Sequence, residues 1–296
     1  MLSDIEQALC AARSNLIDPN AVDALHYLGN YTRRLPVTLT RMMENAHDWE
    51  HLPFVHPSSF ASINLIDSGP WGWRAKLGVP SGGHQLIDLI VDMDRHFWVS
   101  TVISGMGQGT QIHTHATDAN VGAGEAAIGI DVRFYLPAAP ADLSIGAVAL
   151  QYLRGQYGQL YDEDEALMLG RQSALDDRKR WAQVDQITPD LTLCLGAEAA
   201  LDRTQTHTVE WQAHRFALRF WQGQWLVHSA VCPHLLGPLD GRDVDANGII
   251  TCPWHGYRFD IRTGENQTGQ CKDMKKPPLI DIREGQIFLT ESLSEV

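Results

Sequence analysis

The sequence predicts two domains, an α+β domain followed by an all-β domain. The 296 residues are enough for two modest domains, each with a core of its own. Runs rich in Val, Ile, Trp and Phe, with the character of strands, occupy much of residues 62–135, and a helical pattern follows them. Beyond residue 195 the pattern is one of short strands and turns. We therefore expect domains at residues 1–195 and 196–296.

The expected elements follow in that order along the chain. Residues 1–50 are expected to form helix and loop, because Ile5, Leu9 and Ala12 recur at helical spacing. Six strands are expected at Ser62–Ile66, Trp71–Leu77, Gln85–Met93, Phe97–Ile103, Gln111–Thr117 and Ala127–Tyr135. A helix at about Asp164–Trp181 and a linker within Asp185–Leu201 complete the first domain. The second domain is expected to contain strands at Thr208–Trp211, Arg215–Trp221, Trp225–Ala230, Ile249–Thr251, Arg258–Asp260 and Gln286–Thr290.

Composition excludes several classes of protein. The formal charge of −13 argues against nucleic acid as the main partner, because binding to phosphates needs a basic face. No apolar run reaches the roughly 18 residues of a membrane span, and the first residues lack the pattern of a signal peptide. Five cysteines are too few, and odd in number, for a disulfide scaffold. We expect a soluble, cytoplasmic protein with no membrane partner.

The strongest chemical signal lies in the second domain. The sequence CPH at residues 232–234 is followed, after seventeen residues, by CPWHG at residues 252–256. Each segment offers one thiolate and one imidazole, so the two together supply four metal ligands. Such spacings also suit zinc. The pairing of Cys-x-His with Cys-x-x-His, the flanking prolines, and a glycine that lets backbone amides approach sulfur favour an iron–sulfur cluster.

These residues, and about one hundred around them, closely resemble the Rieske [2Fe-2S] family. The resemblance implies that one iron of the cluster is held by Cys232 and Cys252, and the other by His234 and His255. Two imidazoles in place of two thiolates raise the reduction potential relative to an all-cysteine cluster. High-potential members of the family brace the two loops with an extra disulfide. Gly237 and Trp254 stand at the matching positions here, which implies the lower-potential ferredoxin and oxygenase types.

A second group of candidate ligands lies near residue 50, where three histidines and three acids occur within residues 44–56. Asp48 and His51 are three residues apart, so they are expected on one face of a helix. Pro53 is then expected to end that helix and to turn His56 back toward His51. Two imidazoles and one carboxylate form the facial triad of non-haem Fe(II) oxygenases, which leaves positions open for dioxygen and substrate.

This spacing resembles the mononuclear-iron motif of Rieske ring-hydroxylating oxygenases, in their α subunits. The resemblance implies that His51 and His56 are ligands of a mononuclear Fe(II). It also implies that Asp48 is a bridge through which electrons pass from a cluster histidine to that iron. The family's iron domain has a helix-grip fold of the START/SRPBCC type, in which a curved antiparallel sheet wraps a long C-terminal helix. The expected strands and helix of residues 1–195 agree with that fold.

The third iron ligand in this family is an acid at the start of a late helix, a short distance before a glutamine. Asp164, eight residues before Gln172, is the expected ligand, and Asp162 and Glu163 are alternatives. An acidic run at a helix N-terminus also has a simpler explanation, because the helix dipole favours negative charge there.

The family usually places the Rieske domain first, whereas the order is reversed here. The resemblance implies a homotrimer in which the cluster of one subunit lies beside the iron of its neighbour, although the reversed order also permits transfer within one chain.

The function expected is that of the oxygenase component of a multicomponent Rieske-type oxygenase. Dioxygen and external electrons would serve to hydroxylate an apolar aromatic or cyclic small molecule, by monooxygenation, dioxygenation or oxidative demethylation. The sequence contains no dinucleotide or flavin motif, so a separate NAD(P)H-dependent reductase or ferredoxin must supply the electrons. The alternative is a non-enzymatic, ferredoxin-like Rieske electron carrier fused to a helix-grip ligand-binding module. A zinc-binding structural protein is a third interpretation.

Overall fold

The computed structural model describes residues 2–119, 126–184 and 192–291, which form two compact units, Met1–Leu169 and Gly170–Val296. The division falls inside the long helix α4 (Leu143–Val184), rather than near Leu195 as the sequence suggested. The last turns of α4 belong to the second unit because they pack within its core, as described below. Residues 185–191 of the expected linker lie outside the described residues.

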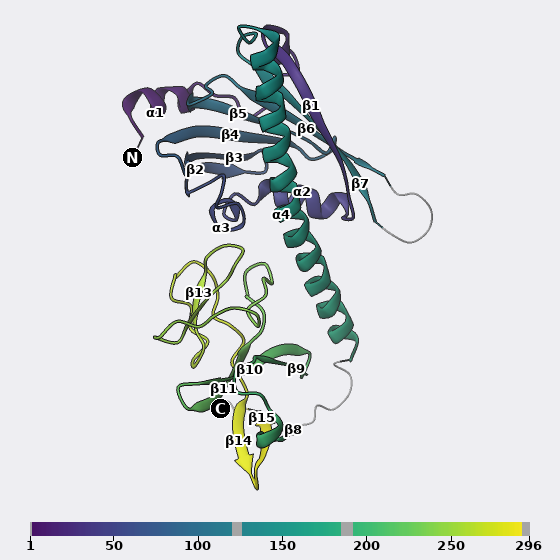
Figure 1. Ribbon diagram of the computed structural model, residues 1–296, viewed down its shortest axis with the longest axis vertical. Coiled ribbons are helices and arrows are strands. Elements are labelled where there is room, and N and C mark those ends of the chain that lie inside the picture. Colours follow the sequence, from purple (N-terminus) through teal and green to yellow (C-terminus); the bar gives the residue numbers. More distant parts are fainter. Residues whose placement is uncertain (1, 120–125, 185–191, 292–296) are drawn as a thin grey trace. The chain divides into compact units, whose positions relative to one another are not determined.

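The first unit is built on a seven-stranded antiparallel sheet with the strand order β1-β7-β6-β5-β4-β3-β2 (Figure 1). Its strands are β1 (His26–Leu35), β2 (Ser62–Gly69), β3 (Gly72–Gly78), β4 (His84–Asp92), β5 (Phe97–Gly105), β6 (Gln111–Asp118) and β7 (Ile128–Leu136). Its other elements are α1 (Asp4–Ala11), the 3-10 turn η1 (Ala21–Ala24), α2 (Leu39–His47), α3 (Leu52–Val55) and the first part of α4. The six strands expected between residues 62 and 135 are confirmed.

Strand β1 was not expected, because the sequence suggested only helix and loop in residues 1–50. It pairs along its whole length with β7, from His26 opposite Leu136 to Leu35 opposite Ile128. These partners are about one hundred residues apart in the sequence. Pairing with so distant a strand is a tertiary interaction, which the local hydrophobic pattern does not reveal.

The first part of α4 covers one face of this sheet, as Figure 1 shows. Tyr161 and Met168 of the helix are buried against side chains of the sheet such as Val132 and Phe134. The expectation that this helix begins at Asp164 is wrong, since it begins at Leu143. Three glycines between residues 143 and 163 weaken the helical signal, because glycine has a low helix propensity. A long helix on one face of an antiparallel sheet is the expected helix-grip architecture.

The second unit contains three small antiparallel sheets with strand orders β11-β10-β9, β12-β13 and β14-β15-β8. Their strands are β8 (Thr192–Ala197), β9 (His207–Trp211), β10 (His214–Trp221), β11 (Gln224–Ser229), β12 (Ile249–Thr251), β13 (Arg258–Asp260), β14 (Leu279–Arg283) and β15 (Gln286–Thr290). A 3-10 turn, η2 (Glu198–Ala200), follows β8. The short strands expected from the sequence are present, and β8 and β14 are additional. This part of the chain is all-β, apart from the end of α4.

Small side chains bring the last turns of α4 close to the second unit's strands. Ala174 is buried in one cluster with Ala217 of β10 and Ala230. Arg171 donates a hydrogen bond to the backbone carbonyl of Leu235 at 3.2 Å. The helix therefore supports the loop that carries the first Cys-x-His motif.

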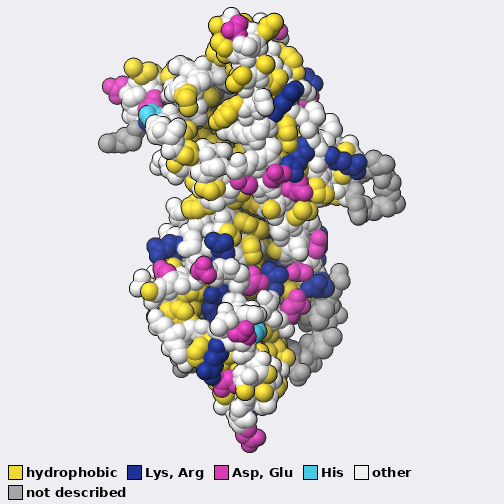
Figure 2. All heavy atoms as spheres, in the orientation of Figure 1, with side chains coloured by type: hydrophobic (Ala, Val, Ile, Leu, Met, Phe, Trp, Pro, Cys, Tyr) yellow, Lys and Arg dark blue, Asp and Glu magenta, His cyan; other side chains and the backbone are white. Residues whose placement is uncertain are grey.

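Charged side chains of both signs are interspersed on the face shown in Figure 2, rather than gathered into a basic stripe. None of the helices in the described residues is both long enough and apolar enough to span a membrane.

Candidate metal centres

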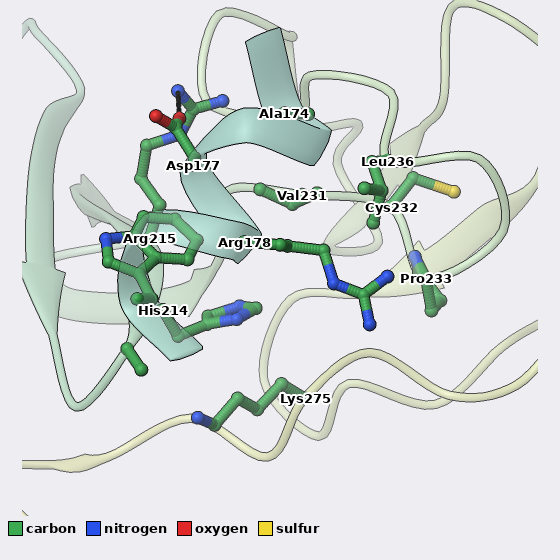
Figure 3. A pocket seen from close by; sticks show the side chains of 12 residues that line it. Ala174, Asp177, Arg178, His214, Arg215, Val231, Cys232, Pro233, Leu236 and Lys275 are labelled. Carbon is green, nitrogen blue, oxygen red and sulfur yellow. Dashed lines mark ion pairs between the residues drawn. The ribbon is translucent and has the colours of Figure 1, made fainter. Parts of the chain in front are cut away.

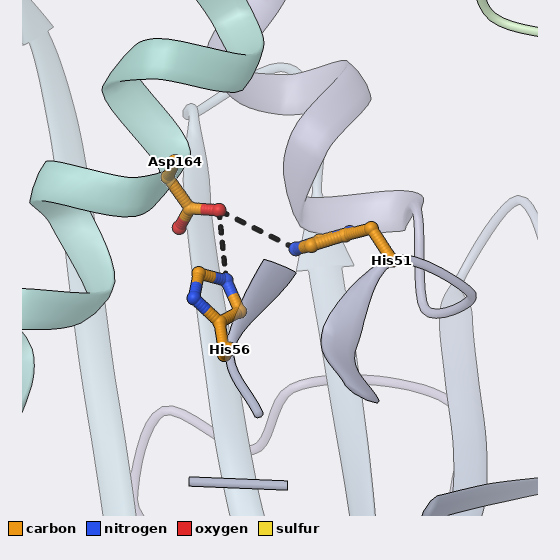
Figure 4. A group of neighbouring side chains, drawn as sticks. All are labelled: His51, His56 and Asp164. Carbon is orange, nitrogen blue, oxygen red and sulfur yellow. Dashed lines mark hydrogen bonds and ion pairs between the residues drawn. The ribbon is translucent and has the colours of Figure 1, made fainter. Parts of the chain in front are cut away.

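Three side chains predicted as iron ligands, His51, His56 and Asp164, meet in the interior of the first unit (Figure 4). Their exposed fractions are 2%, 1% and 8%, and their ligand atoms all lie within 4.8 Å of one another. Oδ1 of Asp164 lies 3.0 Å from Nε2 of His56 and 3.3 Å from Nε2 of His51. Two imidazole nitrogens thus face one carboxylate oxygen.

A single helical turn, α3, separates the two histidines. Its backbone begins with His51 as the N-cap and ends with His56 as the C-cap, whose N–H donates to the Leu52 carbonyl at 3.0 Å. Pro53 lies in the first turn, where its fixed φ and missing N–H are compatible with the start of a helix. The expectation that Pro53 ends a helix is therefore wrong, because α2 already ends at His47 and Pro53 helps to begin α3.

Asp164 comes from the middle of α4, not from the start of a helix, so a dipole-favoured N-terminal position does not explain the acidic run. The side chain of Tyr161, one turn earlier, is buried in the core, and Asp164 follows it on the same inward face. Asp162 and Glu165 lie on another face, where Arg33 of β1 pairs with both at 2.6 Å. Of the alternatives, Asp162 is thus directed away from the histidine pair.

Glu163 reaches His56 from the side opposite Asp164. Its Oε2 lies 2.7 Å from Nδ1 of His56, and Gln159 donates a hydrogen bond to its Oε1 at 3.0 Å. A carboxylate on one ring nitrogen holds the proton there and leaves the other nitrogen available as a ligand. The sequence offered Glu163 as an alternative ligand, whereas its position is that of a partner that orients His56.

Asp48 lies beside His51, as the C-cap of α2. Its Oδ2 is 3.6 Å from Nδ1 of His51, the ring nitrogen that does not face Asp164. The two residues do not share a helical face as expected, because α2 ends before Asp48. The carboxylate of Asp48, for which a bridging role was predicted, nevertheless lies next to the imidazole of His51.

The electrostatics of the three side chains fit a cation. Burial opposes ionisation of Asp164, but His51 and His56 outweigh it and hold the pKa of Asp164 well below its usual value. Burial likewise opposes protonation of His51, yet the contacts with Asp164 and Asp48 raise the pKa of His51 to about 10. Among the described residues, none gives either nitrogen of His51 a hydrogen bond of normal geometry. Buried polar atoms without such partners are rare, and two imidazoles with one carboxylate suit divalent iron.

The two loops predicted to hold the cluster, the first loop (residues 232–237) and the second loop (residues 252–257), have matching backbones. In each, the N–H four residues after the cysteine donates to the cysteine carbonyl, at 3.1 Å and 3.0 Å. The cysteine N–H donates to the carbonyl five residues on, at 2.9 Å and 2.8 Å. The φ angles are also equivalent, +66° at Leu236 and +68° at Gly256. Positive φ is uncommon for leucine, and such strain is often found at functional sites.

The four predicted cluster ligands point toward one another from these loops. The side chains of Cys232 and Cys252 are 0% and 1% exposed, and the rings of His234 and His255 are 4.6 Å apart between centroids. A hydrogen bond between the two thiols lowers the pKa of Cys252 to about 5 and raises that of Cys232. Two buried sulfurs beside two paired imidazoles are the donor set of a Rieske cluster.

Gly237 is required by this arrangement. A Cβ atom at Gly237 would lie 2.8 Å from Sγ of Cys252 and 3.1 Å from the ring of Trp254. The loops therefore approach so closely that an added Cβ atom would require the sulfur, the Trp254 ring or the loop itself to shift.

Sequence reasoning missed Arg33 and Leu236. Arg33 lies on the unexpected strand β1, and its two partners are recognisable only once α4 is placed over the sheet. The residue type at position 236 does not indicate a positive φ, because leucine rarely adopts one. Glycine, which adopts it readily, stands at the equivalent position of the second loop.

Comparison with known proteins identifies the second domain. Residues 192–280 match the family model of the Rieske [2Fe-2S] domain. A human "Rieske domain-containing protein" is 29% identical over 77 residues, which cover 25% of this chain and 49% of that protein. The chain thus spans about half the length of this curated relative.

Solved structures similar to parts of the chain include two kinds of protein. The ferredoxin of carbazole 1,9a-dioxygenase from Nocardioides aromaticivorans is 18% identical, with a TM-score of 0.31, and covers 35% of this chain and 100% of its own. Norcoclaurine synthase from Thalictrum flavum is 14% identical, with a TM-score of 0.37, and covers 53% of this chain and 97% of its own. From the family match, the chain carries a Rieske domain, which implies a [2Fe-2S] cluster, after an α+β domain of helix-grip architecture.

Proposed function

We propose that this chain is the oxygenase component of a multicomponent Rieske-type oxygenase. The observation that carries the proposal is the buried set of two imidazoles and one carboxylate in a chain that also has a Rieske domain. The proposed ligands of a mononuclear Fe(II) are His51, His56 and Asp164. The proposed ligands of the [2Fe-2S] cluster are Cys232, His234, Cys252 and His255.

The proposed reaction consumes one dioxygen molecule, two electrons and two protons per substrate molecule. In monooxygenation one oxygen atom enters the substrate and the other leaves as water, whereas in dioxygenation both enter the substrate. A ferrous ion held by these two imidazoles and one carboxylate would offer open positions for dioxygen and substrate. A separate NAD(P)H-dependent reductase or ferredoxin would supply the two electrons that balance the reaction, and the [2Fe-2S] cluster held by the second domain would carry them singly.

The roles of this chain's own residues follow from their contacts. Glu163 holds the proton on Nδ1 of His56 and so keeps Nε2 available as a ligand. Asp48 orients His51 through the opposite ring nitrogen, and it is the proposed link to a cluster histidine. Burial of the three ligands excludes bulk water from the reacting atoms.

An apolar aromatic or cyclic substrate is proposed because aromatic and aliphatic side chains also lie beside the histidines. The ring of Phe60 lies 6.2 Å from that of His56, and Phe60 packs in a cluster with Trp49 and Leu52. A homotrimer is the proposed assembly, in which the cluster of one subunit serves the iron of the next.

Iron content and one substitution test the proposal. The purified chain is expected to contain three irons, two in the cluster and one at the histidine pair. His51→Ala should abolish oxygen-dependent formation of product, measured by mass, while the visible spectrum of the cluster persists. His47→Ala is the matched control, since this histidine of the same segment contacts the carbonyl of Met43. Unchanged turnover in His51→Ala would rule out the oxygenase.

A second candidate is an electron carrier with a Rieske domain attached to a ligand-binding module. It is favoured by the family match, which is confined to residues 192–280. This candidate predicts two irons per chain and electron transfer to an acceptor protein that is unaffected by His51→Ala.

A further inference from the structure

A hollow of about 630 Å³ lies on the outer face of the sheet in the first unit, the face turned away from α4. Trp98 and Phe134 are buried in one cluster with side chains of α4. Because successive residues of a strand point to opposite faces, their neighbours Phe97 and Tyr135 face outward, where they line the hollow. The hollow of the second unit shown in Figure 3 includes Cys232 of the first loop, so it belongs to the cluster site already described.

A segment before β1, here called the strap (residues 13–22), lies on this outer face and forms one wall of the hollow. Arg13 donates two hydrogen bonds to Asp88 of β4, at 2.8 Å and 3.2 Å, and the side chain of Asp88 is 0% exposed. Arg74 of β3 donates a hydrogen bond to the side chain of Asn15 at 3.2 Å. Breaking a buried ion pair is costly, so the strap is held in place and the hollow is formed before any ligand binds.

The strap and the sheet both supply apolar walls. Leu16, Ile17 and Val22 line the hollow from the strap, and Ile90 and Met93 line it from β4 and the turn that follows. The size of the hollow falls within the range of small-molecule sites, which are lined mainly by such side chains. These walls favour the apolar body of a small molecule.

Three rings on neighbouring strands form a row beside these walls. The ring of His113 in β6 lies 5.6 Å from that of Phe97 in β5 and 4.8 Å from that of Tyr135 in β7, measured between centroids. All three residues line the hollow. The outward face of an antiparallel sheet is commonly polar, so an aromatic row there is unusual. Such a row offers a planar aromatic molecule favourable ring contacts.

His113 also supplies a hydrogen-bond acceptor. The residue is 7% exposed, and its Nε2 lies 2.9 Å from Oε1 of Gln111. An amide oxygen only accepts, so Nε2 carries the proton and Nδ1 is the acceptor. Among the described residues, none donates a hydrogen bond to this Nδ1. Burial, followed by the charges of His115 and Arg133, lowers the pKa of His113 to about 4, so the ring is neutral near pH 7.

Charged side chains of both signs also line the hollow, and several of them lie beside a partner. Arg133 is 2.8 Å from Asp131 of the same strand, and Arg95 is 3.7 Å from Asp92. Charges that are already paired favour neither an anion nor a cation, so the lining suits a ligand without net charge.

We propose that this hollow binds a neutral, planar aromatic molecule that carries a hydrogen-bond donor, as the hydroxyl group of a phenol does. The ring of the ligand packs against Phe97 and Tyr135, and its hydroxyl group donates to Nδ1 of His113. The residues that line the hollow include neither the proposed iron ligands nor the proposed cluster ligands. The site therefore does not depend on the proposed oxygenase function.

Calorimetric titration of the full-length chain with its cluster tests the site, with p-cresol as the probe and 4-methylanisole as the analogue without a donor. p-Cresol is expected to bind saturably, and 4-methylanisole about three- to tenfold more weakly, the scale of one neutral hydrogen bond. His113→Phe keeps a ring but removes the acceptor, so it should raise the Kd for p-cresol by a similar factor and abolish the preference over 4-methylanisole. His115→Phe is the matched control, because His115 lies on the same face of β6 but is not among the residues that line the hollow.

Nuclear magnetic resonance of the chain labelled with ¹⁵N-histidine gives an independent readout in the native protein. p-Cresol should shift the Nδ1 resonance of His113, which is identified by its loss in His113→Phe. The Kd should be native in His51→Ala, so failure of the oxygenase proposal leaves this site intact.

The proposal is overturned if p-cresol fails to bind saturably, if 4-methylanisole binds equally well, or if the Nδ1 resonance of His113 does not move at saturation. It is also overturned if the Kd is unchanged in His113→Phe but rises in His51→Ala, because p-cresol would then lie at the histidine pair.

Discussion

The carboxylate of Glu163 lies 2.7 Å from Nδ1 of His56, while its neighbour in the sequence, Asp164, lies 3.0 Å from Nε2 of the same ring. Consecutive residues of α4 thus contact both nitrogens of one imidazole. This relationship separates the two acids into different roles, with Asp164 among the proposed ligands and Glu163 as the residue that positions a ligand.

Replacement of Glu163 by alanine should weaken iron retention at the histidine pair. Loss of such an orienting partner typically costs 10- to 100-fold in metal affinity. The measurement is iron bound per chain after dialysis against a graded series of chelator concentrations. Asp162→Ala is the control, since Asp162 contacts Arg33 rather than a histidine. Equal iron retention in the Glu163→Ala and native proteins would contradict a positioning role.

Gly237→Ala should impair the assembly of the cluster. The added Cβ would lie 2.8 Å from Sγ of Cys252, so either the sulfur or the loop must shift. Overpacking of this kind costs about 1–3 kcal/mol. Acid-labile sulfide per chain and the visible circular dichroism spectrum are expected to fall. At the control position Gly241 an added Cβ would meet no described atom within 4 Å, so Gly241→Ala should retain the native spectrum.

Arg33→Met should destabilise the docking of α4 on the sheet. The guanidinium pairs with Asp162 and Glu165 at 2.6 Å, and its removal leaves two like charges one turn apart. Because Asp162 is largely exposed, we expect a loss of about 1–2 kcal/mol in the free energy of unfolding. Urea unfolding followed by circular dichroism measures it. The control is Arg95→Gln, because the side chain of Arg95 is 79% exposed, and this variant should change the free energy of unfolding by less than about 0.5 kcal/mol. A loss in Arg95→Gln equal to that in Arg33→Met would argue against a specific role for Arg33.

Stability should fall on acidification because of His228. This residue is 0% exposed, and burial, followed by the charge of Arg219, lowers its pKa from 6.5 to about 4. Below pH 6.5 the unfolded chain binds a proton that the folded chain refuses, so stability decreases until about pH 4, by about 3 kcal/mol in total.

His228→Gln should make the stability less dependent on pH in this range, because glutamine does not titrate. Urea midpoints at several pH values between 7 and 4 would measure the effect, with His207→Gln in strand β9 of the same sheet as the control. If the urea midpoints of the native and His228→Gln proteins fell in parallel with decreasing pH, another group would be the cause of the acid sensitivity.

Local sequence patterns were sufficient to predict those helices and strands whose structure is determined by their own residues. The six strands between residues 62 and 135 were predicted because hydrophobic runs separated by turn residues specify them. Strand β1 and the first half of α4 were not predicted from the sequence. Strand β1 is stabilised by pairing with β7, and the first half of α4 by packing over the sheet, more than either is by its own sequence pattern. Gly146, Gly155 and Gly158 further weaken the helical pattern of α4.

The candidate sites show the same division. The sequence by itself determined the Cys-x-His and Cys-x-x-His loops and the pair His51 and His56, because these candidate ligands lie close together along the chain. Only the tertiary structure decided among Asp162, Glu163 and Asp164. Successive residues on an α-helix point about 100° apart, so three neighbouring acids face three different surroundings. Which of them faces the histidines depends on how α4 lies on the sheet, and that is set by contacts between residues far apart in the sequence.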